Sequence, residues 1–147
     1  MEHDGQFCTF FVHGLFMGVE VTRVQEVIRY QQLTHVPLTP PIIAGLMNLR
    51  GQIVTAIDLR RRLGLPERAD GELPVNVVIR SSEGAMSLLV DHIGDVIDVA
   101  AESFERPPQT LTGDARELIL GAYKLEGRLL LVLDTVRALD LADGTIN

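Results

Sequence analysis

The chain has 147 residues, of which 46% are hydrophobic, and its formal net charge at pH 7 is −7. This length fits one globular domain, and an acidic chain repels phosphate backbones, which disfavours a nucleic-acid partner. No apolar run approaches the roughly 20 residues that span a bilayer, so we expect no direct membrane insertion. The acidic N-terminus lacks the basic region of a signal peptide, and the single cysteine, Cys8, excludes an internal disulfide. These features predict a soluble, cytoplasmic protein.

Short apolar stretches bounded by Gly, Pro or Asp dominate the chain, and many are β-branched, which is typical of strands. The turn-forming residues at 81–84 and 126–127 predict two hairpins. We expect strands at Gln6–Val12, Leu15–Val21, Val27–Val36, Gln52–Ile57, Val75–Arg80, Met86–Val90, Val96–Ala100, Leu118–Leu125 and Arg128–Leu133.

Three short helices are expected where a polar side chain can accept hydrogen bonds from a first helical turn. Thr22 begins a capping-box pattern, which predicts a helical turn that ends near Glu26. Asp58 is expected to cap a helix over residues 59–63, and Asp134 one that continues to about Leu141.

A further helix is predicted to begin at Thr39-Pro40-Pro41. Proline fits the first turn of a helix because no backbone N–H is needed there. The apolar residues that follow would then share one helical face; they are Ile42, Ile43, Leu46 and Met47.

Two parts of the chain resemble each other. Residues 51–63 align with residues 127–139 at an offset of 76, which pairs Gly51 with Gly127 and Asp58 with Asp134. Farther upstream, residues 21–28 align with 90–97 at an offset of 69. Matching Gly and Asp positions favour an internal duplication over a chance alignment of apolar strands. We therefore expect residues 51–63 and 127–139 to form the same strand-then-helix element.

The usual residues of catalytic and metal centres form no recognisable pattern. None of the four histidines is spaced for a helical metal pair, and Cys8 has no CxxC partner. Cys8 lies in an apolar strand beside phenylalanines, so we expect a buried, slowly reacting thiol. Asp58 and Asp134 are explained as helix caps. We predict no catalytic, metal or cofactor site.

The basic run Arg60-Arg61-Arg62 lies on the predicted helix 59–63. Consecutive side chains fan out around a helix and do not form one patch. We interpret the run as a solvated face that interacts favourably with the helix dipole, in preference to an anion site.

The segment Asn48-Leu49-Arg50-Gly51 joins an apolar stretch to a predicted buried strand. Gly51 can adopt a φ that other residues avoid. Arg50 would then lie at an exposed corner, where its planar guanidinium suits a partner's carboxylate. An internal ion pair, for example with Glu26, is an equally good interpretation from the residues alone.

Several short motifs of the chain recur together in one known family. They are Val24-Gln25-Glu26-Val27, Val36-Pro37, Ile42-Ile43-Ala44-Gly45-Leu46-Met47-Asn48-Leu49-Arg50-Gly51, Ile53-Val54, Ile57-Asp58-Leu59-Arg60 and Leu89-Val90-Asp91. On these residues the sequence resembles the CheW family, from about Phe7 to Leu141. The motif around Arg50 carries most of this resemblance, and Thr55 departs mildly from it, at a position where the family often has proline.

The resemblance implies a mainly β fold of two SH3-like, five-stranded β-barrels around a shared hydrophobic core, with short helices. This expectation agrees with the internal duplication. We expect one domain over residues 7–141, with approximate halves at 13–66 and 74–133 and a C-terminal helix at 134–141.

The resemblance also implies a non-catalytic adaptor that couples the cytoplasmic tips of chemoreceptors to the regulatory domain of a CheA-type histidine kinase. Such a protein is recruited to membrane receptor arrays through its partners. By position, the residues that match the receptor-facing region are Val24, Glu26, Gly45, Asn48 and Arg50. The kinase-facing surface has no equally specific motif and is expected on an edge of one barrel.

Three alternatives remain open at this point. An adaptor of a non-flagellar pathway, such as pilus motility or a second-messenger output, would have the same sequence features. A small hydrolase that uses Asp58 or Glu26 lacks a nucleophile and base. An SH3-like nucleic-acid module is opposed by the charge of −7.

Overall fold

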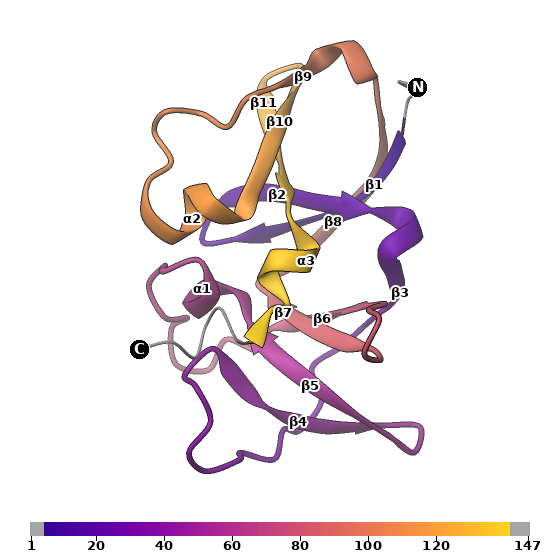
Figure 1. The fold of residues 1–147 in the computed structure, drawn as a ribbon, viewed down its shortest axis with the longest axis vertical. Helices are drawn as coiled ribbons and strands as arrows, with labels where there is room; N and C mark the ends of the chain where they lie inside the picture. The colour runs from indigo at the N-terminus through magenta and orange to yellow at the C-terminus, as the bar shows by residue number, and fades with distance from the viewer. Residues whose placement is uncertain (1–4, 142–147) are drawn as a thin grey trace.

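The computed structural model describes residues 5–141, which form two β-sheets and short helices (Figure 1). Sheet A has the strand order β8-β1-β2-β11-β10-β9, and sheet B has the order β3-β6-β7-β5-β4. The strands of sheet A are β1 (Gly5–Val12), β2 (Leu15–Glu20), β8 (His92–Val99), β9 (Phe104–Glu105), β10 (Ile119–Leu125) and β11 (Arg128–Leu133). The strands of sheet B are β3 (Val24–Ile28), β4 (Ile43–Leu49), β5 (Gln52–Asp58), β6 (Val75–Ile79) and β7 (Met86–Val90). The helices are η1 (Val21–Arg23), α1 (Leu59–Arg62), η2 (Ala101–Ser103), α2 (Gly113–Leu118) and α3 (Thr135–Ala138).

Each sheet curls until its two edges approach each other. In sheet A, β8 and β9 lie at opposite ends of the strand order, but only residues 100–103 separate them along the chain. A chain extends by at most about 3.6 Å per residue, so those edges must lie close together. In sheet B, Thr34 follows β3 and pairs with Leu46 of β4, through N–H to O distances of 2.7 and 2.9 Å. This curling agrees with the expected pair of SH3-like barrels.

Strands from both halves of the sequence contribute to each sheet. Sheet A combines β1 and β2 with strands β8–β11, and sheet B combines β3–β5 with β6 and β7. The predicted halves 13–66 and 74–133 therefore do not coincide with one sheet each. The chain crosses from sheet A to sheet B after β2 and returns to sheet A after β7, which joins them into one unit.

The internal duplication is confirmed in three dimensions. The hairpins β4–β5 and β10–β11 carry a register shift at the same place, between Ile43 and Gly45 and between Ile119 and Gly121. Both hairpins lead into a four-residue helix, α1 or α3. The predicted caps are also confirmed: the Asp58 carboxylate accepts from the Arg60 N–H, and the Asp134 carboxylate accepts from the Arg137 N–H.

One apolar core lies between the sheets. Phe10 and Met17 of sheet A, and Ile57 and Leu88 of sheet B, are buried in the same cluster of side chains. All three α-helices contribute to this cluster, for example through Leu118 of α2. Cys8 is buried in it too, as predicted.

Two predictions about the segment between Glu20 and Gln52 are wrong. Residues 43–49 form strand β4 and not a helix, because their backbone groups pair with β5, and Pro40 accepts from the Ile43 N–H in a turn. The strand predicted at residues 27–36 begins earlier, at Val24, and ends at Ile28. The helical turn expected at Thr22 is the 3-10 helix η1, but no side chain caps it.

Candidate partner-binding site

The five predicted partner-binding residues lie on the two edges of sheet B. Val24 and Glu26 belong to β3, while Gly45 and Asn48 belong to β4. Arg50 follows in the turn between β4 and β5. Because the sheet curls, residues on these opposite edges can meet in space.

The turn that holds Arg50 has two consecutive residues in left-handed conformations. The φ angles are +52° at Arg50 and +88° at Gly51, the pattern of a type I′ hairpin turn. The Asn48 side chain supports this turn, since its Oδ1 accepts a 2.8 Å hydrogen bond from the Gly51 N–H. The prediction that Gly51 adopts an unusual φ is confirmed.

The structure confirms the internal ion pair of Arg50 and leaves its side chain accessible. Its Nη2 donates to Oε2 of Glu26, which forms an ion pair across the two edges of sheet B. The Arg50 side chain is nevertheless 66% exposed, against 23% for Glu26. A guanidinium has five donor hydrogens, so Arg50 retains capacity to bind a partner's carboxylate or carbonyl groups.

Gly45 allows the segment after β3 to lie directly on β4. A Cβ built on Gly45 would lie 2.7 Å from the backbone oxygen of Thr34 and 3.0 Å from Cβ of Leu33. Any side chain here would displace the Thr34–Leu46 pairing. Gly45 therefore shapes the site without offering a contact group of its own.

Val24 is separate from the Arg50 corner. Its half-buried side chain packs against the shared core, and its carbonyl accepts a 2.7 Å hydrogen bond from the Arg80 guanidinium. The structure thus brings together Glu26, Asn48 and Arg50, with Gly45 as support, and places Val24 at the beginning of β3 next to η1.

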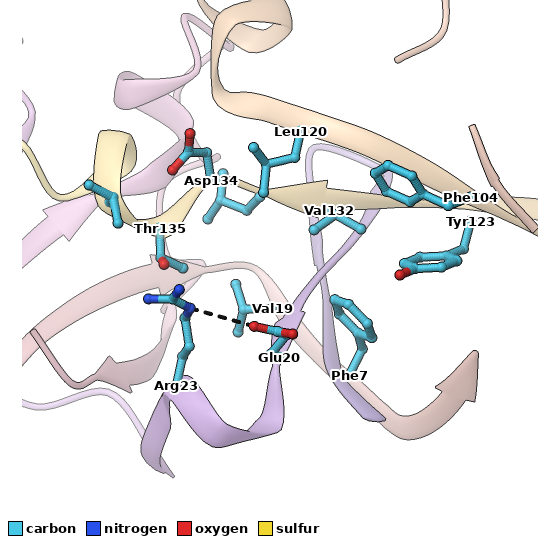
Figure 2. A pocket seen from close by; sticks show the side chains of 12 residues that line it. Phe7, Val19, Glu20, Arg23, Phe104, Leu120, Tyr123, Val132, Asp134 and Thr135 are labelled. Atoms are coloured by element: carbon cyan, nitrogen blue, oxygen red, sulfur yellow. Dashed lines mark ion pairs between the residues drawn. The ribbon is translucent and has the colours of Figure 1, made fainter. Parts of the chain in front are cut away.

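Next to η1 lies a cleft that sequence reasoning missed (Figure 2). It has a volume of about 220 Å³ and is lined in part by Phe104, Leu120 and Val136, with exposed fractions of 45%, 57% and 69%. Arg23 and Glu20 form an ion pair at 3.7 Å on its wall. No motif marks these apolar residues, because each is an ordinary strand or helix residue in the sequence.

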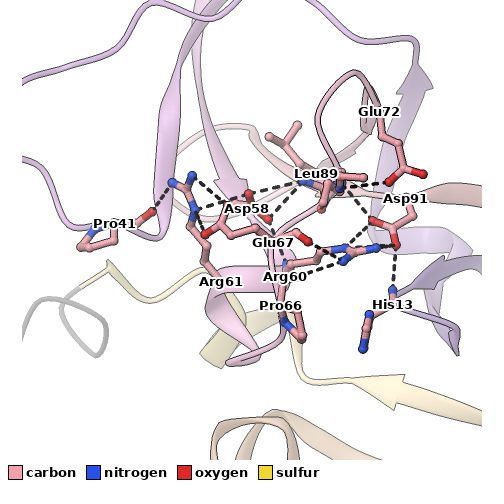
Figure 3. A network of polar contacts seen from close by, with 12 residues as sticks. His13, Pro41, Asp58, Arg60, Arg61, Pro66, Glu67, Glu72, Leu89 and Asp91 are labelled. Atoms are coloured by element: carbon pink, nitrogen blue, oxygen red, sulfur yellow. Dashed lines mark hydrogen bonds and ion pairs between the residues drawn. The ribbon is translucent and has the colours of Figure 1, made fainter.

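The interpretation of Arg60-Arg61-Arg62 as a solvated face is wrong for two of the three residues. Arg60 forms a buried ion pair with Asp91 at 2.6 Å (Figure 3). Arg62 is buried and donates to the backbone oxygens of Arg137 and Ala138, at the end of α3. Arg61 alone keeps a partly exposed position, with Glu67 at 3.1 Å. A helix of four residues leaves these side chains within reach of neighbouring loops, which local sequence does not reveal.

The environment of Asp91 lowers the pKa of its carboxyl. Burial acts in the opposite direction, to raise the pKa, but hydrogen bonds from the Arg60 guanidinium and the His13 N–H outweigh it. The positive charges of Arg60 and Arg68 add to the lowering. The carboxylate is therefore ionised at neutral pH and holds two arginines in fixed positions.

Over residues 5–141, no helix has the length and apolar character needed to cross a membrane. The same part of the chain contains no cluster of three or more His, Cys, Asp or Glu side chains arranged for a metal ion.

Comparison with known proteins decides the family. The model of the CheW-like domain matches residues 6–143. The chain belongs to the CheW-like family. Relatives include the chemotaxis protein CheW of Bacillus subtilis, 34% identical over 89% of this chain and 84% of that protein. The chemotaxis protein CheW of Klebsiella aerogenes is 31% identical over 91% of this chain and 81% of that protein.

A solved structure supports the fold of this family member. The crystal structure of the scaffolding protein TtCheW from Thermoanaerobacter tengcongensis has a TM-score of 0.85 to this chain and 24% sequence identity. The match covers 98% of each chain. The two-sheet architecture described above is therefore the architecture of the whole domain in that protein as well.

Proposed function

We propose that the protein is a non-catalytic chemotaxis adaptor that couples chemoreceptors to a CheA-type histidine kinase. The observation that carries this proposal is the CheW-like match over residues 6–143, which spans both sheets. The relatives named chemotaxis protein CheW agree with it. The protein acts in the cytoplasm and reaches receptor arrays through its partners.

The receptor-facing surface is centred on the corner formed by Glu26, Asn48 and Arg50. Arg50 is mostly exposed there. Its backbone is already fixed by the hairpin turn, so little main-chain conformational entropy is lost when a partner binds. Its ion pair with Glu26 holds the guanidinium over the closed end of sheet B. A receptor helix that offers a carboxylate or its C-terminal carbonyls fits this charge.

The kinase-facing surface is an edge of one barrel, and β8 fits this role best. β8 has eight residues and, within residues 5–141, a hydrogen-bonded neighbour on only one side, β1. Val96 on this strand is 58% exposed. An unpaired strand edge with exposed apolar side chains favours docking of another β-domain, and the regulatory domain of the kinase is itself expected to be CheW-like.

A binding assay with two partners tests the proposal. The kinase regulatory domain and a receptor cytoplasmic fragment should each bind the protein, and both should bind at once. Binding of neither partner would contradict the adaptor role.

The alternative, an adaptor of a non-flagellar pathway such as pilus motility or a second-messenger output, uses the same surfaces with different partners. A gene deletion separates the two pathways. Loss of flagellar chemotaxis on swim plates supports the first proposal, while normal swimming with a defect in surface motility or second-messenger level supports the alternative.

A further inference from the structure

The internal repeat gives two equivalent junctions between the sheets. The first is the crossing from β7 to β8, which holds Asp91, and the second is the crossing from β2 to β3, which holds Thr22. Parallel pairing of Thr55 with Met86 in sheet B corresponds to pairing of Leu131 with Met17 in sheet A, which confirms both offsets, 76 and 69. By the same offsets, Arg60 corresponds to Val136, Asp91 to Thr22 and His13 to Ser82. These three pairs of residues differ in chemistry, although Asp58 of the first junction corresponds to Asp134 of the second.

The first junction contains a cluster of ion pairs, which we call the Asp91 cluster: Asp58, Arg60, Arg68 and Asp91. Figure 3 labels three of these residues, Asp58, Arg60 and Asp91. The Asp91 carboxylate accepts from Arg60 at 2.6 and 3.0 Å and from Arg68 at 2.9 Å. Arg68 also lies 3.4 Å from the Asp58 carboxylate. All four side chains are 9–11% exposed.

The Asp91 cluster connects sheet B to sheet A. Asp91 follows β7 at the point where the chain crosses from sheet B to β8 of sheet A. Its carboxylate accepts a 2.7 Å hydrogen bond from the N–H of His13, in the β1–β2 turn, and its own N–H donates to Phe11 of β1 at 2.9 Å. Arg60 and Arg68 hold the same carboxylate from α1 and the following loop, on the side of sheet B.

At the second junction the positions equivalent to Arg60 and Asp91 carry no charged side chain. A cleft of about 530 Å³ lies there, lined in part by Arg80, Ser82 and Val136. Val136 takes the place of Arg60, and Thr22 takes the place of Asp91, so the ion pair cannot form. The first junction thus carries a set of ion pairs that the equivalent residues of the second junction cannot form.

From this asymmetry we propose that Asp91 is a positioning residue that fixes the orientation of sheet A relative to sheet B. The apolar core alone is not directional, so it resists separation of the sheets more than rotation between them. A forked arginine–carboxylate contact adds a specific geometry, and in a buried site each partner depends on the other. The Asp91 cluster supplies both the specific geometry and the mutual dependence of partners at the first junction.

This role matters for signalling only if the proposed function is right. The Arg50 corner lies on sheet B, and the β8 edge lies on sheet A. An adaptor that presents two partners on different sheets needs a fixed angle between them. Asp91 fixes that angle without touching either partner.

The distance between the sheets tests the proposal directly. Gln52 of β5 and Lys124 of β10 are both exposed and lie on different sheets. They are replaced by cysteine for spin labelling, with Cys8→Ala in the same chain, and the distance distribution is measured by pulsed electron resonance. The variants compared are Asp91→Asn, Arg68→Gln, and Arg61→Gln as the control. Arg61 lies on the same helix as Arg60, but its contacts with Pro41, Asp58 and Glu67 all stay on the side of sheet B.

We expect a single narrow distribution for the parent and for Arg61→Gln, and a broadened or shifted one for Asp91→Asn. Circular dichroism establishes that each variant is folded. If Asp91→Asn does not fold, Arg68→Gln serves as the test variant. It keeps the Arg60–Asp91 pair, so we expect it to fold and to show a smaller broadening of the distance distribution. A folded Asp91→Asn, or Arg68→Gln in its place, with the distribution of the parent would overturn the proposal.

A second measurement separates this inference from the proposed function. Binding of the receptor fragment and of the kinase regulatory domain is measured separately for the unlabelled parent and Asp91→Asn, followed by receptor-dependent kinase activity with all three proteins. We expect both binary affinities to be kept and the kinase response to fall. A parent that binds neither partner refutes the adaptor role but leaves the distance result intact. A full kinase response in Asp91→Asn refutes the signalling role of Asp91.

Discussion

Arg50 and Glu26 form an ion pair that joins the two edges of sheet B, although 24 residues separate them in the sequence. Glu26 lies on β3, and Arg50 lies in the turn after β4. The pair therefore closes one end of the curled sheet and leaves a mostly exposed guanidinium, which we propose binds the receptor. Its two roles can be separated by measurement.

Replacement of Arg50 by alanine should weaken receptor binding and leave the fold stable. An ion pair with one side chain this exposed contributes about 1 kcal/mol or less to the free energy of unfolding. A buried arginine anchor in an interface contributes roughly 2 kcal/mol or more, which is about a thirtyfold loss of affinity. Thermal melting and receptor binding are measured on the same preparation.

Arg116→Ala is the matched control, because Arg116 is an exposed arginine of α2, away from the corner. It should bind the receptor normally. A large fall in melting temperature for Arg50→Ala would make Arg50 a structural residue, and unchanged binding would remove it from the interface.

Replacement of Gly45 by alanine should destabilise the protein. The new Cβ would meet the Thr34 backbone oxygen at 2.7 Å, a contact that only a shift of the backbone relieves. We expect a loss of about 2 kcal/mol in the free energy of unfolding. Urea denaturation measures it, with Gly5→Ala as the control, since its Cβ would meet only ordinary contacts. Equal urea midpoints for the two variants would show that the Thr34 segment moves away from the new Cβ at no measurable cost in stability.

The sequence predicted those elements whose signals are local. The Asp caps of α1 and α3, the hairpin turns and the repeat of residues 51–63 at 127–139 are each determined by residues that are neighbours in the chain. The apolar stretch at 42–47 was predicted as a helix because short apolar runs fit either period. Pairing with β5, which local sequence does not show, makes it a strand.

The partners of Arg60 and Arg62 could not be predicted from the basic run. Asp91 lies 31 residues from Arg60, and the Ala138 carbonyl lies 76 residues from Arg62. Both contacts depend on how the sheets pack. The position of Asp91 directly after the strand Met86–Val90 could have indicated its role, because an ion pair is the usual way to satisfy a carboxylate beside the core.

Asp91 should make stability depend on pH in the acid range. The pKa of its carboxyl is lowered in the folded protein, so its stabilising effect is present above the unfolded pKa of about 3.9 and is lost as the pH falls through the folded pKa. At pH 7, Asp91→Asn should lower the free energy of unfolding by about 3 kcal/mol. Urea midpoints at pH 7 and pH 3 should show a gap between parent and variant that narrows in acid. A gap that stays constant would mean that the carboxylate charge contributes nothing.

Cys8 should react slowly with a thiol reagent in the native protein. Its side chain is buried, and burial raises the pKa of the thiol, so little thiolate forms at pH 8. We expect a rate roughly tenfold or more below that of free cysteine. The same protein in urea is the control and should react at the free rate. Equally fast reaction in both states would show that β1 opens readily.

Reconstitution of a receptor, a CheA-type kinase and this protein tests the adaptor role most directly. Autophosphorylation of the kinase is measured with and without the protein, in the presence of receptor-containing membranes. The adaptor role predicts that receptor control of kinase activity appears only when the protein is added, and that it weakens with Arg50→Ala but not with Arg116→Ala. Receptor control that is the same without the protein, from a kinase and receptors known to need an adaptor, would contradict it.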